Sequence, residues 1–104
     1  ALVNRLLGPL AEGDETAVIR VVERALQLLS DRENLTIRVN PKDLRSLVEA
    51  KPLLLESFDG IQKLTVLEDP AVKRGGCLVQ TPTSEIDARL ETQLAELARA
   101  LRNS

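Results

Sequence analysis

The sequence predicts a small mixed α/β domain, in which a three-stranded mixed sheet is covered by helices in the order α-α-β-α-β-β-α. Two patterns predict this fold class. Short stretches alternate apolar and polar residues, which is the period of a strand, and longer stretches between them repeat apolar residues at the period of a helix. With 104 residues, 43% of them hydrophobic and 29% charged, the chain is long enough for one domain with one core.

Residues 1–30 are predicted to be helical. Gly8-Pro9 breaks a first short helix, and a second helix follows from about residue 14 to residue 30. The stripe of the first helix either packs on its own domain or continues an upstream, dimer-forming helix, and we take it as the candidate surface for self-association. It consists of Leu2, Val3, Leu6 and Leu7.

Residues 35–104 are predicted to form an α/β head. Residues 35–39 alternate as a half-buried strand, after which Asn40 caps a helix and Pro41 occupies its first turn. Pro52 is expected to interrupt this helix and leave a second short helical segment. A helical crossover of this kind joins parallel strands, so we expect the first two strands of the sheet to be parallel.

The last third of the chain holds the remaining strands and the last helix. Residues 61–68 and 77–81 are predicted strands that we expect to pair antiparallel, and Gly75-Gly76 form a turn before the second of them. Ser84 and Asp87 resemble a capping box, which predicts a helix start between them. This helix needs a surface to dock on, because five aliphatic residues follow each other on one face: Ile86, Leu90, Leu94, Leu97 and Leu101.

The residue patterns of two segments resemble those of a known family. These are Gly-Gly-Cys-Leu-Val-x-Thr followed by Ile-Asp-Ala-Arg-Leu-Glu-Thr-Gln-Leu in residues 75–94, and Ile-Arg-Val-Asn-Pro-Lys-Asp in residues 37–43. They are similar to the C-terminal domain of the FliH/SctL family, with a serine at position 84 where members commonly have glycine. The matching positions that carry the motif are Pro41, Gly75, Gly76, Asp87, Leu90, Gln93, Leu94 and Leu97.

The resemblance implies a function without catalysis. Members are stator-like regulators of the type III protein export ATPase, and the chain would be the C-terminal ATPase-binding domain of a longer protein with an upstream coiled coil. The implied partners are the N-terminal region of that ATPase, a second copy of the chain, and the sorting-ring and export-gate proteins through the upstream region. Gly75-Gly76-Cys77 favours the flagellar system over the injectisome. The peripheral-stalk E subunit of V/A-type rotary ATPases, which the family resembles in architecture, is the alternative.

The composition argues against an enzyme. Histidine is absent, and Cys77 is a lone thiol within a predicted strand, where we expect a small buried side chain. Lys73-Arg74-Gly75-Gly76 lacks the spacing of a phosphate-binding loop, so we expect no cofactor and no metal.

The charge pattern also indicates which classes of partner and which cellular compartment to expect. A net charge of −2 with a single aromatic residue gives no footprint for nucleic acid, which leaves an RNA-binding α/β module as a distant alternative. No apolar run approaches a membrane span. Together with the lone cysteine, these features predict a cytoplasmic protein, which the resemblance would place at the cytoplasmic face of the inner membrane.

Overall fold

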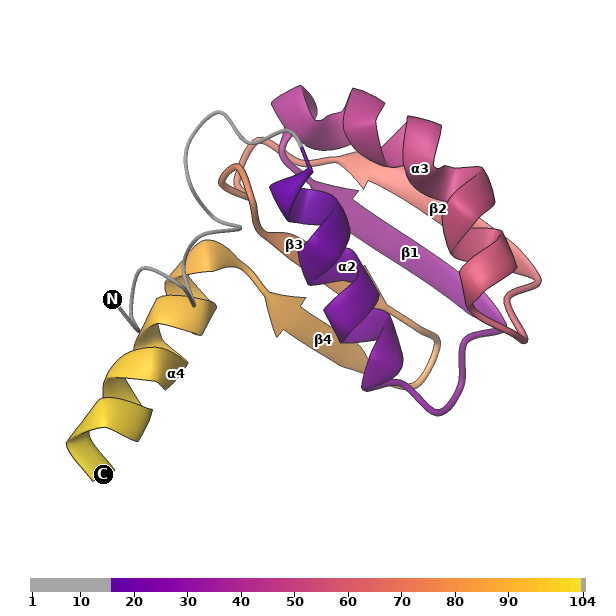
Figure 1. Cartoon of the computed structure of the whole chain (residues 1–104). Helices are drawn as coiled ribbons and strands as arrows, with labels where there is room; N and C mark the ends of the chain where they lie inside the picture. The colour runs from indigo at the N-terminus through magenta and orange to yellow at the C-terminus, as the bar shows by residue number, and fades with distance from the viewer. Residues whose placement is uncertain (1–15, 104) are drawn as a thin grey trace.

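The computed structural model describes residues 16–103 and contains a four-stranded mixed sheet with three α-helices (Figure 1). The predicted mixed α/β class is confirmed, and the sheet has one strand more than expected. Its order is β2-β1-β3-β4, from β1 (Asn34–Val39), β2 (Lys63–Glu68), β3 (Cys77–Gln80) and β4 (Glu85–Ala88). The helices are α2 (Ala17–Gln27), α3 (Leu44–Ser57) and α4 (Leu90–Asn103), with a short 3-10 helix η2 (Pro41–Asp43) before α3.

Strand β1 lies in the middle of the sheet. It pairs parallel with β2, as the crossover through α3 predicts, and antiparallel with β3. The sequence-based expectation that β2 and β3 pair with each other was wrong, because β1 lies between them. Leu35, Ile37 and Val39 are almost wholly buried. A central position in the sheet, with a strand on either side, gives these apolar residues of β1 the most burial.

Helices α2 and α3 cover one face of the sheet (Figure 1). Their apolar stripes pack on the alternate residues of the strands that point to the same side. The core is almost entirely aliphatic, and its most deeply buried large side chains are Val18, Val22, Leu26, Leu35, Ile37, Val39, Leu47, Leu54, Val72 and Val79.

Helix α3 runs without a break through Pro52, contrary to the predicted interruption. Proline removes the hydrogen bond that its N–H would donate to the carbonyl four residues earlier, which belongs to Val48. Both Pro52 and Val48 are exposed. Because that position lies on the solvent side of the helix, water can replace the missing donor, and the buried contacts of Leu47 and Leu54 hold both halves in one helix.

Strand β4 occupies the residues that were predicted to begin the last helix. Thr81 N–H donates to the Ser84 carbonyl over 2.8 Å, and the Thr81 hydroxyl accepts a hydrogen bond from Ser84 N–H over 2.9 Å. Ser84 therefore closes a β-hairpin rather than capping a helix. Ile86 then pairs with Val79 and contacts the core, so the helix begins only at Leu90.

Candidate interaction surface at the last helix

Helix α4 differs from the other two because none of its residues is buried. It leaves the sheet at the end of β4 and projects away from the layer formed by α2 and α3 (Figure 1). Four leucines follow each other on one face at spacings of four, three and four residues, and we call them the leucine seam. Leu90 and Leu97 are half-buried, while the exposed fractions of Leu94 and Leu101 are 42% and 53%.

Gly76 allows the beginning of α4 to lie close against the sheet. We call this beginning with its approach from β4, residues 87–93, the root of α4. A Cβ atom at this position would lie 2.8 Å from the Leu90 nitrogen and 2.9 Å from Arg89 Cα, which is closer than real contacts allow. Because these are backbone atoms, no side-chain movement relieves the contact. Glycine at position 76 therefore permits the close approach from which α4 departs.

Asp87 binds the first residues of α4 through both carboxylate oxygens. Oδ1 accepts hydrogen bonds from Arg89 N–H at 3.1 Å and Arg89 Nε at 3.0 Å, and Oδ2 accepts from the Thr92 hydroxyl at 2.9 Å. The Arg89 side-chain hydrogen bonds, with smaller contributions from the Arg89 backbone N–H and Thr92, lower the pKa of Asp87 to about 2. The Asp87 carboxylate is therefore ionised in the folded domain at neutral pH.

Gln93 adds a third contact at the same place. Its side-chain Nε2 donates to the Ala88 carbonyl over 2.6 Å, and its backbone N–H donates to the Arg89 carbonyl over 3.0 Å. The first bond ties α4 to the last residue of β4, and the second begins the helix. Together with Asp87 and Gly76, Gln93 fixes the direction in which the leucine seam leaves the domain.

The buried carboxylate of Asp43 holds the turn that contacts the root of α4. Asp43, whose exposed fraction is 2%, accepts from Arg74 Nε at 3.1 Å and from Gly75 N–H at 2.9 Å. Gly75 has φ of +85°, a left-handed conformation that glycine adopts without strain. The Asp43 side chain makes no capping hydrogen bond to α3, although the residue directly precedes that helix, and positions the Gly75-Gly76 turn instead.

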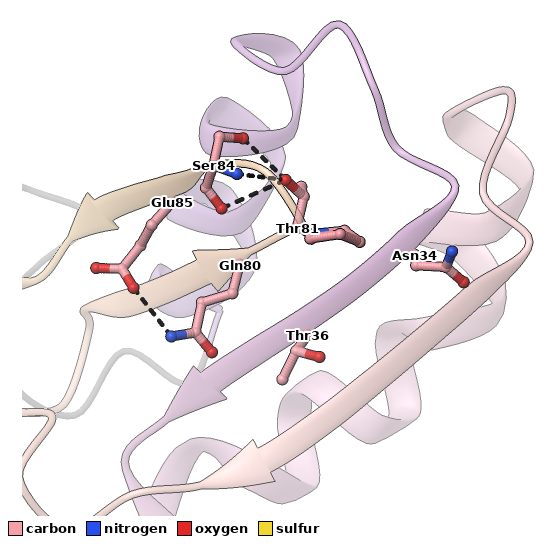
Figure 2. A pocket seen from close by; sticks show the side chains of 7 residues that line it. Asn34, Thr36, Gln80, Thr81, Ser84 and Glu85 are labelled. Carbon is pink, nitrogen blue, oxygen red and sulfur yellow. Dashed lines mark hydrogen bonds between the residues drawn. The ribbon is translucent and has the colours of Figure 1, made fainter.

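The sheet face opposite α2 and α3 carries a polar hollow of about 410 Å³ (Figure 2). Gln80 Nε2 donates to Glu85 over 2.9 Å and Thr81 bonds to Ser84, so the polar groups along β3 and β4 largely satisfy one another. Arg38 Nε donates to Gln80 over 3.2 Å and extends this network to β1. The hollow offers no nucleophile with a base beside it, and we assign it no chemistry.

The structure brings most of the predicted motif together. Gly75, Gly76, Asp87 and Gln93 meet at the root of α4, and the leucines lie along the helix they orient. Pro41 is separate from this group, because it is the first residue of η2, where Asn40 Oδ1 accepts from Lys42 N–H over 2.9 Å as predicted. The predicted self-association stripe lies outside the described residues: Leu2, Val3, Leu6 and Leu7.

Sequence reasoning missed three contributors to the root, which are Asp43 as a buried anchor, Arg89 and Thr92. The spacing Asp-x-Arg-x-x-Thr was visible in residues 87–92. It is readable as a local hydrogen-bond cluster only once a strand, rather than a helix, is known to end at Ala88.

Cys77 is fully buried, as predicted. Burial raises the pKa of its thiol to about 12, with a smaller effect from the Asp87 carboxylate, so the thiol stays neutral and is not an activated nucleophile. Within residues 16–103, no group of three or more Cys, Asp or Glu side chains is placed to hold a metal ion. None of the helices in that range has the length and apolar character needed to cross a membrane.

Comparison with known proteins adds the family context. The family model described as flagellar assembly protein FliH matches residues 2–97. Flagellar assembly protein FliH of Borreliella burgdorferi is 31% identical over 99 residues, which cover 95% of this chain and 32% of that protein. The type 3 secretion system stator protein of Yersinia enterocolitica is also 31% identical over 99 residues, covering 95% of this chain and 44% of that protein. The chain therefore spans 32–44% of the length of these relatives.

Proposed function

The chain belongs to the FliH family of flagellar assembly and type III secretion stator proteins, and we propose that it is a non-catalytic stator domain that binds the type III export ATPase. The observation that carries the proposal is the match over residues 2–97 to that family, joined to a helix that projects a leucine seam from a fixed root. A stator has to hold a partner by a rigid, exposed surface.

The proposal extends to the rest of the protein and its place in the cell. The domain would work as a homodimer at the C-terminal end of a longer chain, bound to the N-terminal region of the ATPase. An upstream region would link it to sorting-ring and export-gate proteins at the cytoplasmic face of the inner membrane. The flagellar system is favoured by the description of the matching family, although the stator proteins of Yersinia match to the same degree.

The rigid part of this design is the root of α4. Gly76, Asp87 and Gln93 fix the helix by one close backbone approach and several hydrogen bonds, four of which are accepted by the charged carboxylate of Asp87. Charge-assisted bonds of this kind restrict orientation more strongly than neutral ones. A partner bound along α4 would therefore be held at a defined angle to the sheet, as a stator requires.

The test is co-elution of this chain with the type III export ATPase of the same genome, by size exclusion with light scattering. Refractive index has to be the detector, because the chain has no Trp or Tyr. We expect a complex with two copies of the chain per ATPase. Separate elution of the two proteins, repeated with the full-length stator, would contradict the proposal.

Two variants locate the binding face in the same assay. Leu94→Asp alters the leucine seam, and Leu53→Asp alters a leucine of α3 that is 57% exposed. Each places one charge on an exposed apolar surface without touching the core. Loss of the ATPase complex in only one of them assigns the partner to that helix.

A further inference from the structure

We propose that the outer edge of β2 is a docking site for an extended segment of another protein, in which apolar residues alternate with acidic ones and which adds to the sheet as a fifth strand. The site combines β2 with the side of α3 that lies over it, and we call the two the edge surface. It consists of residues 63–68 with Leu44, Val48, Lys51 and Leu55. Because it lies at the opposite edge of the sheet from β4 and α4, the proposal goes beyond the proposed stator function and does not depend on it.

The outer edge of β2 presents backbone groups that have no partner in the sheet. Lys63 N–H donates over 2.9 Å to the carbonyl of Glu33, just before β1, so the odd-numbered residues of β2 direct their N–H and C=O groups towards β1. Leu64 and Val66 therefore direct theirs away from the sheet. In the part of the chain that the structure describes, no other strand pairs with that side of β2. A strand laid alongside matches such a row of donors and acceptors.

The side of α3 over this edge is apolar and exposed. At roughly 100° per residue, Leu44, Val48 and Leu55 share one side of the helix, about a quarter turn from the buried Leu47 and Leu54. Because α3 is a right-handed crossover from β1 to β2, that side faces the outer edge of β2 and points away from α2 (Figure 1). The exposed fractions of Val48 and Leu55 are 51% and 41%. The described part of the domain therefore leaves this side of α3 uncovered.

A strand added at this edge would contact both layers of the domain. The helix from Leu44 to Leu55 and the six residues of β2 each extend over about 16 Å, so the apolar side of α3 follows the whole strand. Successive side chains of an added strand point to opposite faces of the sheet. Those on the helix side would pack on Val48 and Leu55, and those on the open side would lie beside Lys63 and Leu67. The edge surface therefore selects a segment in which two types of residue alternate.

Two lysines determine the charge that the added segment should carry. Lys63 alternates with the buried Leu64 and so lies on the open face of the sheet. Lys51 precedes Leu55 by one turn of α3 on the same side of the helix. Within residues 16–103 neither lysine makes an ion pair. Carboxylates on the segment would complement both charges, and Glu68 at the far end of β2 favours carboxylates at the Lys63 end.

The experiment is a peptide titration of the whole chain, followed by NMR of its backbone amides. The probe is the acetylated and amidated peptide Thr-Val-Glu-Val-Glu-Val-Thr, and the control is Thr-Val-Val-Val-Glu-Glu-Thr, which has the same composition without the alternation. We expect the probe to cause saturable shifts at the amides of Leu64 and Val66 and to slow hydrogen exchange at Val66 severalfold. The control peptide should cause neither change. Shifts confined to other residues, or equal binding of the two peptides, would overturn the proposal.

Methylation of the peptide's own N–H groups separates strand addition from other modes of binding. An added strand pairs with β2 through the N–H groups of every second residue, and its other N–H groups point to solvent. Methylation of the valine nitrogens should abolish binding of an antiparallel strand, and methylation of the glutamate nitrogens should abolish binding of a parallel one. Either result supports the proposal and gives the direction of the segment. Equal effects of the two methylations would contradict strand addition.

Protein variants test both layers of the edge surface. Val48→Asp should weaken binding of the probe severalfold, whereas Leu53→Asp is the matched control, because Leu53 is an exposed leucine on the other side of α3. Lys63→Glu should weaken binding of the probe and strengthen binding of the same peptide with lysines in place of the glutamates. Circular dichroism checks that each variant is folded. Equal binding by Val48→Asp and Leu53→Asp would overturn the proposal.

Residues 1–15 of the chain itself are the competing occupant of this edge. If they pair with β2, the Val66 amide is already protected from hydrogen exchange in the chain alone and the probe does not bind, which would also overturn the proposal. Co-elution with the export ATPase is measured separately. A chain that binds the probe but no ATPase therefore contradicts the proposed function and leaves the edge surface standing.

Discussion

Helices α3 and α4 each contain 14 residues and carry leucines along one side, yet the domain uses them differently. Helix α3 buries Leu47 and Leu54 completely against the sheet, whereas α4 buries no residue. The regularity of the stripe does not decide this difference, because α4 has the more regular spacing of leucines and α3 contains a proline. A regular apolar stripe therefore indicates that a helix has a partner, and only the surrounding sheet decides whether that partner is the helix's own domain.

The largest expected contrast compares one leucine from each helix. Leu47→Ala should lower the free energy of unfolding by about 3 kcal/mol, because it opens a cavity in the core. Leu94→Ala should change it by about 0.5 kcal/mol or less in dilute, monomeric protein, because Leu94 is 42% exposed. Urea unfolding followed by far-UV circular dichroism measures both. Equal losses would mean that α4 is packed as tightly as α3.

The second test removes the buried anchor behind the root of α4. Asp43→Asn should lower the free energy of unfolding by about 2–3 kcal/mol, because the new amide NH₂ must face either Arg74 Nε or Gly75 N–H, both of which are donors. Asp31→Asn is the matched control, since the exposed Asp31 accepts one hydrogen bond from Glu33 N–H over 3.2 Å. It should change stability by less than about 0.5 kcal/mol. Comparable urea midpoints for the two variants would contradict the role of Asp43.

The third test acts on the close approach at Gly76. Gly76→Ala should lower stability by about 2 kcal/mol, because the added methyl group meets the backbone of Arg89 and Leu90. It should also speed amide hydrogen exchange in the first turn of α4. Gly60→Ala is the control: Gly60 has φ of +88° but open space around it, so the variant should lose about 1 kcal/mol and leave exchange in α4 unchanged. If Gly60→Ala speeds exchange in the first turn of α4 and Gly76→Ala does not, Gly76 does not hold the root of α4.

The smallest expected effect is the pH dependence of Asp87. Its pKa is about 2 in the folded domain and 3.8 in the reference state, so the folded state gains stability above pH 4 and loses it as the pH falls towards 2. Because its side chain is 32% exposed, we expect this contribution to be about 1 kcal/mol. Asp87→Asn should lose that amount at neutral pH and flatten the profile between pH 4 and 2. An unchanged profile would show that the carboxylate does not bind the root.

Local chemistry made much of the fold predictable. The strands of residues 35–39 and 77–81, the parallel crossover, the cap at Asn40 and the positive φ at Gly75 all depend on residues close in sequence, and each is present as expected within one or two residues. The motif residues were also identified from the sequence. The meeting of Gly75, Gly76, Asp87 and Gln93 at the root of α4 was not predicted, because the fold brings these residues together and joins Gly75 to Asp43, 32 positions away.

What the sequence determined by itself is therefore the fold class, most element types, and the apolar stripe of the last helix. The tertiary structure decided three things that local patterns leave open. Ile86 joined a fourth strand because Val79 offered it a neighbour facing the core, α3 continued through Pro52 because its inner face is buried on both sides of the proline, and α4 was left extending outwards. In the first two cases the deciding free energy comes from burial against residues of other elements, which no local period records, whereas α4 buries none of its residues.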